Sequence, residues 1–136
     1  MADTGDALDV LADHLAADDG QRATVAAWEI CGLGERLADA VAWQSGVDAV
    51  QAMAAAQSCR EARRYLPPPV SGQPVPTPRA APDAMERCAR LLGLVARILQ
   101  TPGGVRIQPD AGARQAATAH AARAQQALSG ARQTMP

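Results

Sequence analysis

The sequence of 136 residues contains no phenylalanine and no lysine, and its only aromatic residues are two tryptophans and one tyrosine. So few aromatic rings leave no stacking platform of the kind that holds single-stranded nucleic acids. The longest strongly apolar run, residues 91–96, is far shorter than the roughly 20 residues that span a bilayer. Residues 1–6 lack the basic and apolar regions of a secretory signal. We therefore expect a cytoplasmic protein without a membrane span.

Residue types that carry chemistry are also scarce. The three cysteines, Cys31, Cys59 and Cys88, show no Cys-x-x-Cys spacing, so neither a disulfide framework nor a zinc site is indicated. The two histidines, His14 and His120, fall on different predicted helices, whereas a helical metal site needs several ligands on facing positions. No Gly-x-Ser-x-Gly or paired Cys/His signature is present. We expect no catalytic residue, metal or cofactor, and we interpret the cysteines as small buried hydrophobic residues.

What the sequence has in abundance is alanine, which accounts for 32 residues. Alanine is the strongest helix former, and the larger apolar residues recur at spacings of three and four, the period of an amphipathic helix. The predicted fold class is all-α, a small bundle of about five helices. The predicted helices span approximately residues 6–17, 21–44, 46–66 after a cap at Ser45, 84–100 after a cap at Asp83, and 111–128, and a strand-like alternation covers 105–108.

Proline divides the chain, since seven of its ten prolines lie in residues 67–82. No two of these prolines stand three positions apart, so the Pro-x-x-Pro pattern that SH3-type domains bind is absent and a spacer is favoured. The predicted organisation is an acidic helix plus an antiparallel helical hairpin (1–66), a Pro-rich linker (67–82), and an apolar helix with an alanine-rich C-terminal helix (83–136). We expect the two helical parts to form one composite bundle or to pack across chains.

Charge is divided unevenly, although the formal net charge is only −1. Residues 1–58 carry ten acids and two arginines, whereas residues 59–136 carry eleven arginines and four acids. This polarity favours packing of the halves on each other or an oppositely charged partner. Arg60, Arg63 and Arg64 form a candidate basic patch, which would carry an alternative function as a nucleic-acid-associated regulator. The same arginines suit the negative end of their helix and could instead pair with the acidic first helix.

Two predicted helices have apolar residues outside their main stripe. In the second helix, Trp28 and Trp43 lie nearly opposite the stripe, among charged residues. In the fourth helix, Leu91, Leu94 and Ile98 add a flank to a heptad-like stripe, so that more than half of the circumference is apolar. These five residues are the candidate partner surface.

The third predicted helix carries two apolar stripes. The weaker stripe comprises Val47, Val50, Ala54 and Tyr65, and the other comprises Ala52, Ala55, Cys59, Ala62 and Leu66. Small residues on both faces let neighbouring backbones approach closely, so we expect the second and third helices to form an antiparallel hairpin with a very short turn.

A tryptophan stands at the corner between the second and third helices. Trp43, followed by Gly46 and an alanine-rich helix, resembles the corner of the Trp-x-Gly hairpin proteins of type VII secretion. Here the glycine comes three residues after the tryptophan instead of two, and Tyr65 has no acid four residues on, so the export signal of that family is not matched. The resemblance implies a secreted or secretion-associated helical dimer as an alternative. The residues themselves favour a non-catalytic adaptor or accessory protein that binds a protein partner or itself.

Overall fold

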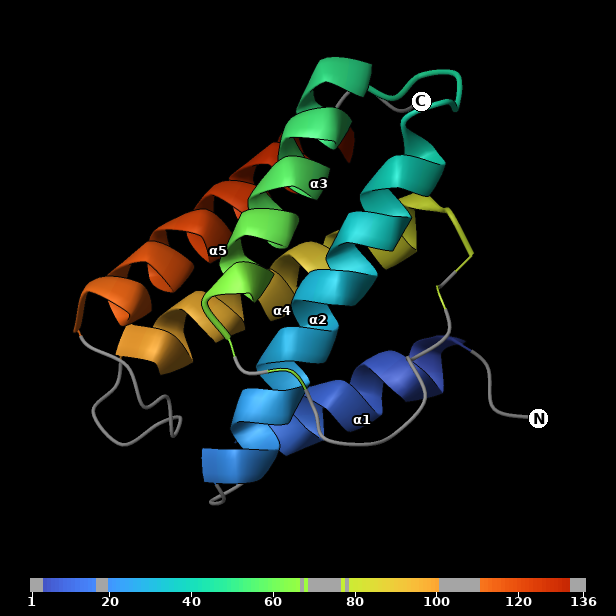
Figure 1. The fold of residues 1–136 in the computed structure, drawn as a ribbon. Coiled ribbons are helices and arrows are strands. Elements are labelled where there is room, and N and C mark those ends of the chain that lie inside the picture. Colours follow the sequence, from blue (N-terminus) through green and yellow to red (C-terminus); the bar gives the residue numbers. More distant parts are fainter. Residues whose placement is uncertain are drawn as a thin grey trace.

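The structure is a computed structural model that describes residues 4–16, 20–66, 68, 77, 79–100 and 111–132. Within these ranges all regular secondary structure is helical, which confirms the predicted class (Figure 1). The helices are α1 (Thr4–Ala16), α2 (Gly20–Val41), α3 (Ala49–Arg64), α4 (Pro82–Gln100) and α5 (Ala111–Arg132). The strand-like segment 105–108 lies outside the described residues. None of the described helices has both the length and the apolar character needed to cross a membrane.

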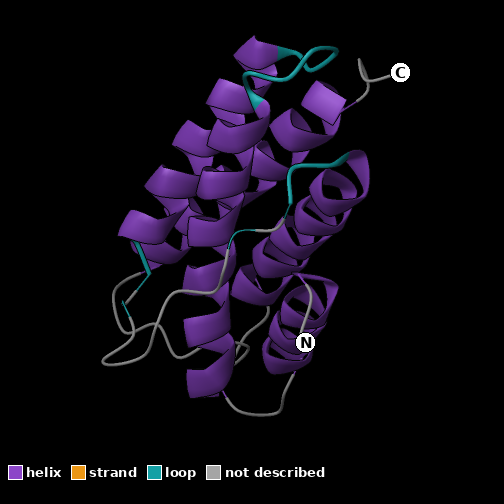
Figure 2. Cartoon of the chain, turned by 90° about the vertical axis from the view of Figure 1, so that its right-hand side faces the viewer, coloured by secondary structure: helices purple, strands orange, loops and turns teal. Residues whose placement is uncertain are grey.

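Four of the helices form a closed ring. Helix α2 packs on α3, α3 on α5, α5 on α4, and α4 on α2, while α1 lies across α2 and α4. Helices α3 and α4 are diagonal in this ring, and no Cα atom of one lies within 8 Å of the other. Ring neighbours run antiparallel, and the turned view shows the described connections at the ends of the helices (Figure 2).

The turn between α2 and α3 differs in detail from the prediction. Helix α2 ends at Val41 because the N–H of Gln44 donates to the Val41 carbonyl over only three residues, at 2.9 Å. Gly46 has a positive φ of 86°, a conformation in which glycine has no steric penalty. The predicted cap at Ser45 is wrong: the side chain of Asp48 caps α3 and accepts a hydrogen bond from the Gln51 N–H at 3.2 Å.

Two other helix ends were also predicted wrongly. Helix α4 begins at Pro82, which suits a first helical position, so Asp83 lies inside the first turn rather than before it. Helix α5 continues past Ser129 and Gly130 to Arg132. Tertiary contacts stabilise this last turn: Gly130 faces the side chain of Gln51, and the Ala131 carbonyl accepts a hydrogen bond from the Asp48 N–H at 3.4 Å.

The described part of the Pro-rich segment is bonded to α2. Arg36 Nε donates to Thr77 Oγ1 at 2.9 Å, and Gln44 Nε2 donates to the Ala80 carbonyl at 3.2 Å. The rest of this segment lies outside the described residues. At these two points the segment is therefore attached to the bundle, which goes beyond the spacer role expected for it.

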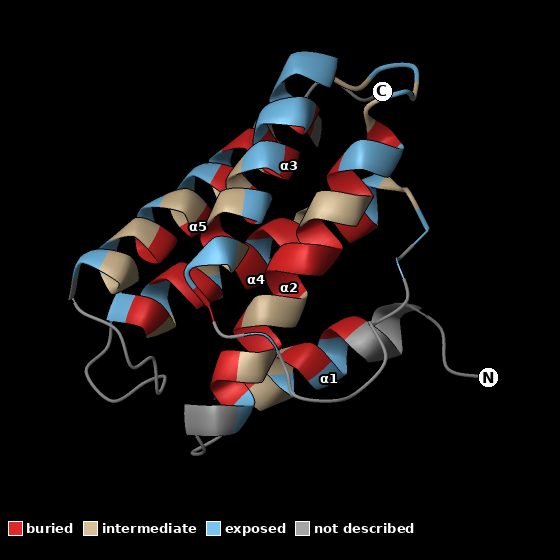
Figure 3. Ribbon diagram, viewed as in Figure 1, coloured by how far each residue is buried: buried red, intermediate tan, exposed pale blue. Residues whose placement is uncertain are grey.

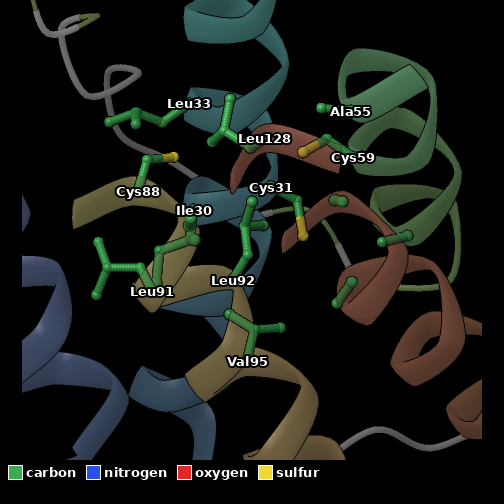
Figure 4. Close-up of a cluster of buried hydrophobic side chains, with 14 of the residues drawn as sticks. Ile30, Cys31, Leu33, Ala55, Cys59, Cys88, Leu91, Leu92, Val95 and Leu128 are labelled. Atoms are coloured by element: carbon green, nitrogen blue, oxygen red, sulfur yellow. The ribbon is translucent and has the colours of Figure 1, made fainter. Parts of the chain in front are cut away.

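The core is narrow and centred on α2 and α4 (Figure 3). The heptad-like stripe of α4 is fully buried, and its residues are Met85, Cys88, Leu92, Val95 and Leu99. Figure 4 shows side chains of α2, α3, α4 and α5 converging there. The seam between α3 and α5 is made mostly of alanines, which allows close approach of the two backbones. The wide apolar arc of α4 is explained by its contacts with α1, α2 and α5.

Candidate functional site

The structure does not bring the five residues of the candidate partner surface together. Leu91 is buried in the core, and Ile98 is partly buried against it. Leu94 is only 37% exposed and lines a hollow of about 210 Å³ where α1 meets α4. The three aliphatic residues therefore lie against other helices of the same chain.

Trp28 is covered from within the chain. Its indole is partly buried against the core, and Cζ of Arg63 lies over the ring at 5.5 Å from the centroid. A guanidinium over an aromatic face is a favourable electrostatic contact. Trp28 therefore belongs to the α2–α3 interface and leaves little apolar surface for a partner.

Trp43 is 92% exposed and lies just beyond the end of α2. On α3, Val50 and Met53 are also large hydrophobic residues with high exposure, 76% and 64%. We refer to Trp43, Val50 and Met53 as the hairpin surface. Single exposed apolar residues are common on proteins, but neighbouring ones of this size mark interaction sites.

A shallow hollow of about 490 Å³ connects α2 and α3 at this surface. It is lined by Asp39, Val50, Met53, Ala54, Ala56, Gln57 and Arg60. Trp43 is not among the residues that line the hollow. It lies in the turn after α2, two residues beyond Val41.

The weaker stripe of α3 is only partly packed, with Val47 partly buried against the core. Val50 and Ala54 are exposed, and Tyr65 is 38% exposed, whereas the alanine stripe with Cys59 is buried as predicted. The outward face of α3 is open along much of its length (Figure 3). The sequence analysis did not single out Met53, and it placed Val50 in the weaker apolar stripe.

The hairpin surface is held in place by the bonds of the turn. Gln44, next to Trp43, is bonded both to Val41 and to the Ala80 carbonyl, and Asp48 caps the helix that carries Val50. Ordering a loop on binding costs conformational entropy. Because this turn is already fixed on both sides, binding at Trp43 would cost less conformational entropy.

The candidate basic patch is largely neutralised by an acid of α2. Arg60 Nε and Arg63 Nη2 lie 2.9 and 2.8 Å from the two carboxylate oxygens of Glu35. The hydrogen bond to Glu35 also raises the pKa of the Arg60 guanidinium. Arg64 Nη1 lies 3.3 Å from Glu61 Oε1 on its own helix. All three arginines thus form ion pairs with acids of the same chain, which weakens the patch as a phosphate-binding surface.

The expected pairing of these arginines with the acidic first helix is wrong. Arg60 and Arg63 reach Glu35 because α3 packs on α2, whereas α1 contacts α2 and α4 and does not contact α3. One ion pair of α1 joins Asp9 to Arg87 of α4, at 2.7 Å.

The three cysteines converge in the core although they come from three helices. All are free and buried, as predicted (Figure 4). A Cβ atom added to Gly34 would lie 2.8 Å from Cys59 Sγ and 3.6 Å from Cys88 Sγ. Cys59 and Cys88 lie on helices whose Cα atoms are all more than 8 Å apart, beyond the span of a disulfide.

Burial makes these thiols poor nucleophiles. It raises the pKa of Cys31 and of Cys88 to about 12, and that of Cys59 well above its usual range. The thiolate is the reactive form, so these groups suit packing rather than catalysis. Across the described residues, no group of three His, Cys, Asp or Glu side chains is placed to hold a metal ion.

The histidines have separate environments. The ring of His120 stacks on that of Tyr65, with centroids 6.1 Å apart and planes 12° from parallel. His14 lies near Glu29; burial raises the pKa of that carboxyl, while the charges of His14 and Arg36 act in the opposite sense.

Comparison with known proteins gives no relatives: no protein-family model, no curated protein and no solved structure matches this chain.

Proposed function

We propose that the protein is a non-catalytic helical interaction protein and that the hairpin surface is its docking site. The 92% exposure of Trp43 is the observation that carries this proposal. The chain has only two tryptophans, and the other one is covered by Arg63. Tryptophan is enriched among the few residues that supply most of the binding free energy in protein interfaces.

The surroundings of Trp43 support a protein ligand over a nucleic acid. The hollow between α2 and α3 is lined by Val50, Met53, two alanines and Gln57, with one acid and one arginine. Arg60 and Arg63 share Glu35, so the nearest cations are already paired. The buried thiols and the separate histidines also favour a binding role over catalysis.

The test is retention of binding partners from an extract of the native host on immobilised protein. We expect Trp43→Ala and Met53→Ala to reduce specific capture by about tenfold or more, since anchor truncations cost about 2 kcal/mol or more. Val10→Ala is the matched control, because Val10 is an exposed aliphatic residue on α1, away from this surface. Capture that is unchanged by both hairpin-surface variants would contradict the proposal.

A further inference from the structure

The described part of the Pro-rich segment presents a hydroxyl group beside a cation. Thr77 is exposed and belongs to no helix, and Arg36 of α2 donates a hydrogen bond from Nε to its Oγ1 at 2.9 Å. An arginine binds an anionic acceptor more strongly than a neutral one, and its planar guanidinium fits the geometry of a phosphate in particular. The donor at this point would therefore suit a more negative partner than a hydroxyl.

The chain at Thr77 is accessible to an enzyme. Thr77 stands between Pro76 and Pro78 in the sequence, and a residue that precedes proline is disfavoured in the helical conformation and favours an extended one. Arg79, two residues further on, is also exposed. Exposed chain outside helices is the part of a folded protein that enzymes reach most readily. Thr77 therefore meets the steric requirements of a modification site.

Thr24 and Thr118, by contrast, are buried within helices. They are only 4% and 8% exposed, in α2 and α5. Thr118 Oγ1 donates to the Arg114 carbonyl of its own helix at 2.9 Å. An enzyme could reach either hydroxyl only after local unfolding of its helix. Of these three threonines, Thr77 alone is open to modification in the folded chain.

We propose that Thr77 is a phosphorylation site and that Arg36 holds the phosphate once it is attached. In this reaction Thr77 Oγ1 attacks the γ-phosphorus of a nucleoside triphosphate bound to a protein serine/threonine kinase. The bond from Oγ1 to phosphorus forms, and the bond from phosphorus to the oxygen that bridges the β- and γ-phosphates breaks. The nucleoside diphosphate leaves, and the hydroxyl proton passes to the catalytic base of the kinase.

The position of Arg36 favours retention of the phosphate. The phosphate oxygens are joined through phosphorus to the same Oγ1 that Arg36 already contacts, so rotation about the Cβ–Oγ1 and Oγ1–P bonds brings them to the guanidinium. The charge of Arg36 also acts on the carboxyl of Glu29. A phosphate carries more negative charge than one carboxylate, about −1.5 to −2 at neutral pH, and it competes well for the arginine.

The other end of the segment is already in place. Gln44 Nε2 donates to the Ala80 carbonyl at 3.2 Å, and the Ala80 side chain packs against the core. Phosphate groups order loops in other proteins by pairing with an arginine in this way. Here the phosphate would strengthen an attachment that exists, so residues 77 and 80 would both be held firmly on α2. This inference does not rest on the proposed docking site.

Mass spectrometry tests the site itself. The full chain is isolated from the native host, and recombinant chain is incubated with host extract and ATP. We expect phosphate on Thr77 in both preparations. Thr77→Val keeps the shape of the side chain without the hydroxyl and is expected to lose most of the incorporated phosphate, whereas Ser45→Ala, at an exposed hydroxyl in the α2–α3 turn, is expected to lose none. An unmodified Thr77 in both preparations would overturn the site, whatever other residues carry phosphate.

Phosphorus NMR tests the role of Arg36, in full chain carrying phosphothreonine at position 77. The second ionisation of the phosphate is expected to have its midpoint about half a pH unit or more lower in wild type than in Arg36→Gln, because a nearby cation favours the doubly charged form. Arg22→Gln is the control: Arg22 is about 21 Å from Arg36 along α2, beyond the screening length of about 8 Å at physiological salt, and its loss should leave the midpoint unchanged. Circular dichroism checks that each variant is folded. Equal midpoints in wild type and Arg36→Gln would overturn the assignment of Arg36.

Discussion

The guanidinium of Arg63 lies over the indole of Trp28 at 5.5 Å, and its Nη2 lies 2.8 Å from Glu35. This contact distinguishes the two tryptophans of the chain. Trp28 joins α2 to α3, whereas Trp43, beyond the end of α2, is left open to solvent. Trp28 thus packs between the two helices of the hairpin, whereas Trp43 remains exposed.

Removing this contact should uncover Trp28. Arg63→Ala is expected to lower the free energy of unfolding by about 1–2 kcal/mol, because a cation–π contact and an ion pair are lost together. Acrylamide quenching of Trp28, measured in a Trp43→Phe background, should increase. Arg64→Ala is the control, since Arg64 pairs with Glu61 at an exposed site and its loss should change stability by less than about 0.5 kcal/mol. Equal acrylamide quenching of Trp28 in the Arg63→Ala and Arg64→Ala variants would contradict the conclusion that Arg63 covers Trp28.

The close packing at Gly34 gives a second prediction. Gly34→Ala is expected to lower the free energy of unfolding by about 1–3 kcal/mol, because the new Cβ would lie 2.8 Å from Cys59 Sγ. Cys59→Ala removes that sulfur, so the double variant should be less destabilised than the sum of the single ones. Gly130→Ala is the matched control: its nearest neighbour, Gln51, is 3.5 Å away, and a helical alanine there should stabilise by up to about 1 kcal/mol. The measurement is urea denaturation of the two single variants and the double variant. A double variant whose loss of stability equals the sum of the two single losses would contradict this packing.

The thiols should react only when the chain unfolds. With Cys31 and Cys88 at a pKa of about 12, a disulfide reagent at neutral pH is expected to label the three cysteines at one common rate, which rises with urea as the global unfolding equilibrium does. The native state holds these protons above the ordinary pKa of 9.0, so stability should fall as pH rises from about 9 toward 12. The slope should be about 1.4 kcal/mol per pH unit for each thiol. Rapid labelling of any cysteine in the absence of denaturant would be incompatible with this core.

Glu29 gives a pH dependence at the acid end. Burial raises its pKa above the usual 4.5, so the native state binds the proton more tightly than the unfolded chain. The protonated Glu29 carboxyl therefore stabilises the native state at low pH. The free energy of unfolding is expected to fall as pH rises from about 4.5 through the raised pKa. Glu29→Gln is expected to flatten the acid limb of the stability profile and to stabilise the protein at neutral pH. The measurement is thermal unfolding between pH 4 and 7, with Asp13→Asn on the exposed face of α1 as the control.

The helices followed from the sequence because their periodic stripes are local signals. The stripe from Met85 to Leu99 is buried as expected, and so is the alanine stripe of α3. The ends of the helices were harder to predict from the sequence. The last turn of α5 depends on Gln51 and Asp48, which are about 80 residues away in the chain, and no local pattern reports such contacts.

The candidate site was predicted only in part, for a related reason. Trp43 was identified because it lies off the stripe of its helix. Trp28 carries the same signal, but its environment is decided by Arg63 across the hairpin. Val50 and Met53 became visible as exposed residues only once the neighbours of α3 were known, since α3 packs on α2 and α5 through its alanines.

Fluorine resonances of the two tryptophans test the central claim, docking through the hairpin surface, most directly. In protein labelled with 5-fluorotryptophan, Trp28 serves as an internal control because Arg63 already covers it. We predict that the Trp43 resonance shifts or broadens when the protein is concentrated or mixed with unlabelled host extract, while the Trp28 resonance keeps its position. A Trp43 resonance that stays at its dilute, solvent-exposed position under both conditions would contradict the proposed docking site.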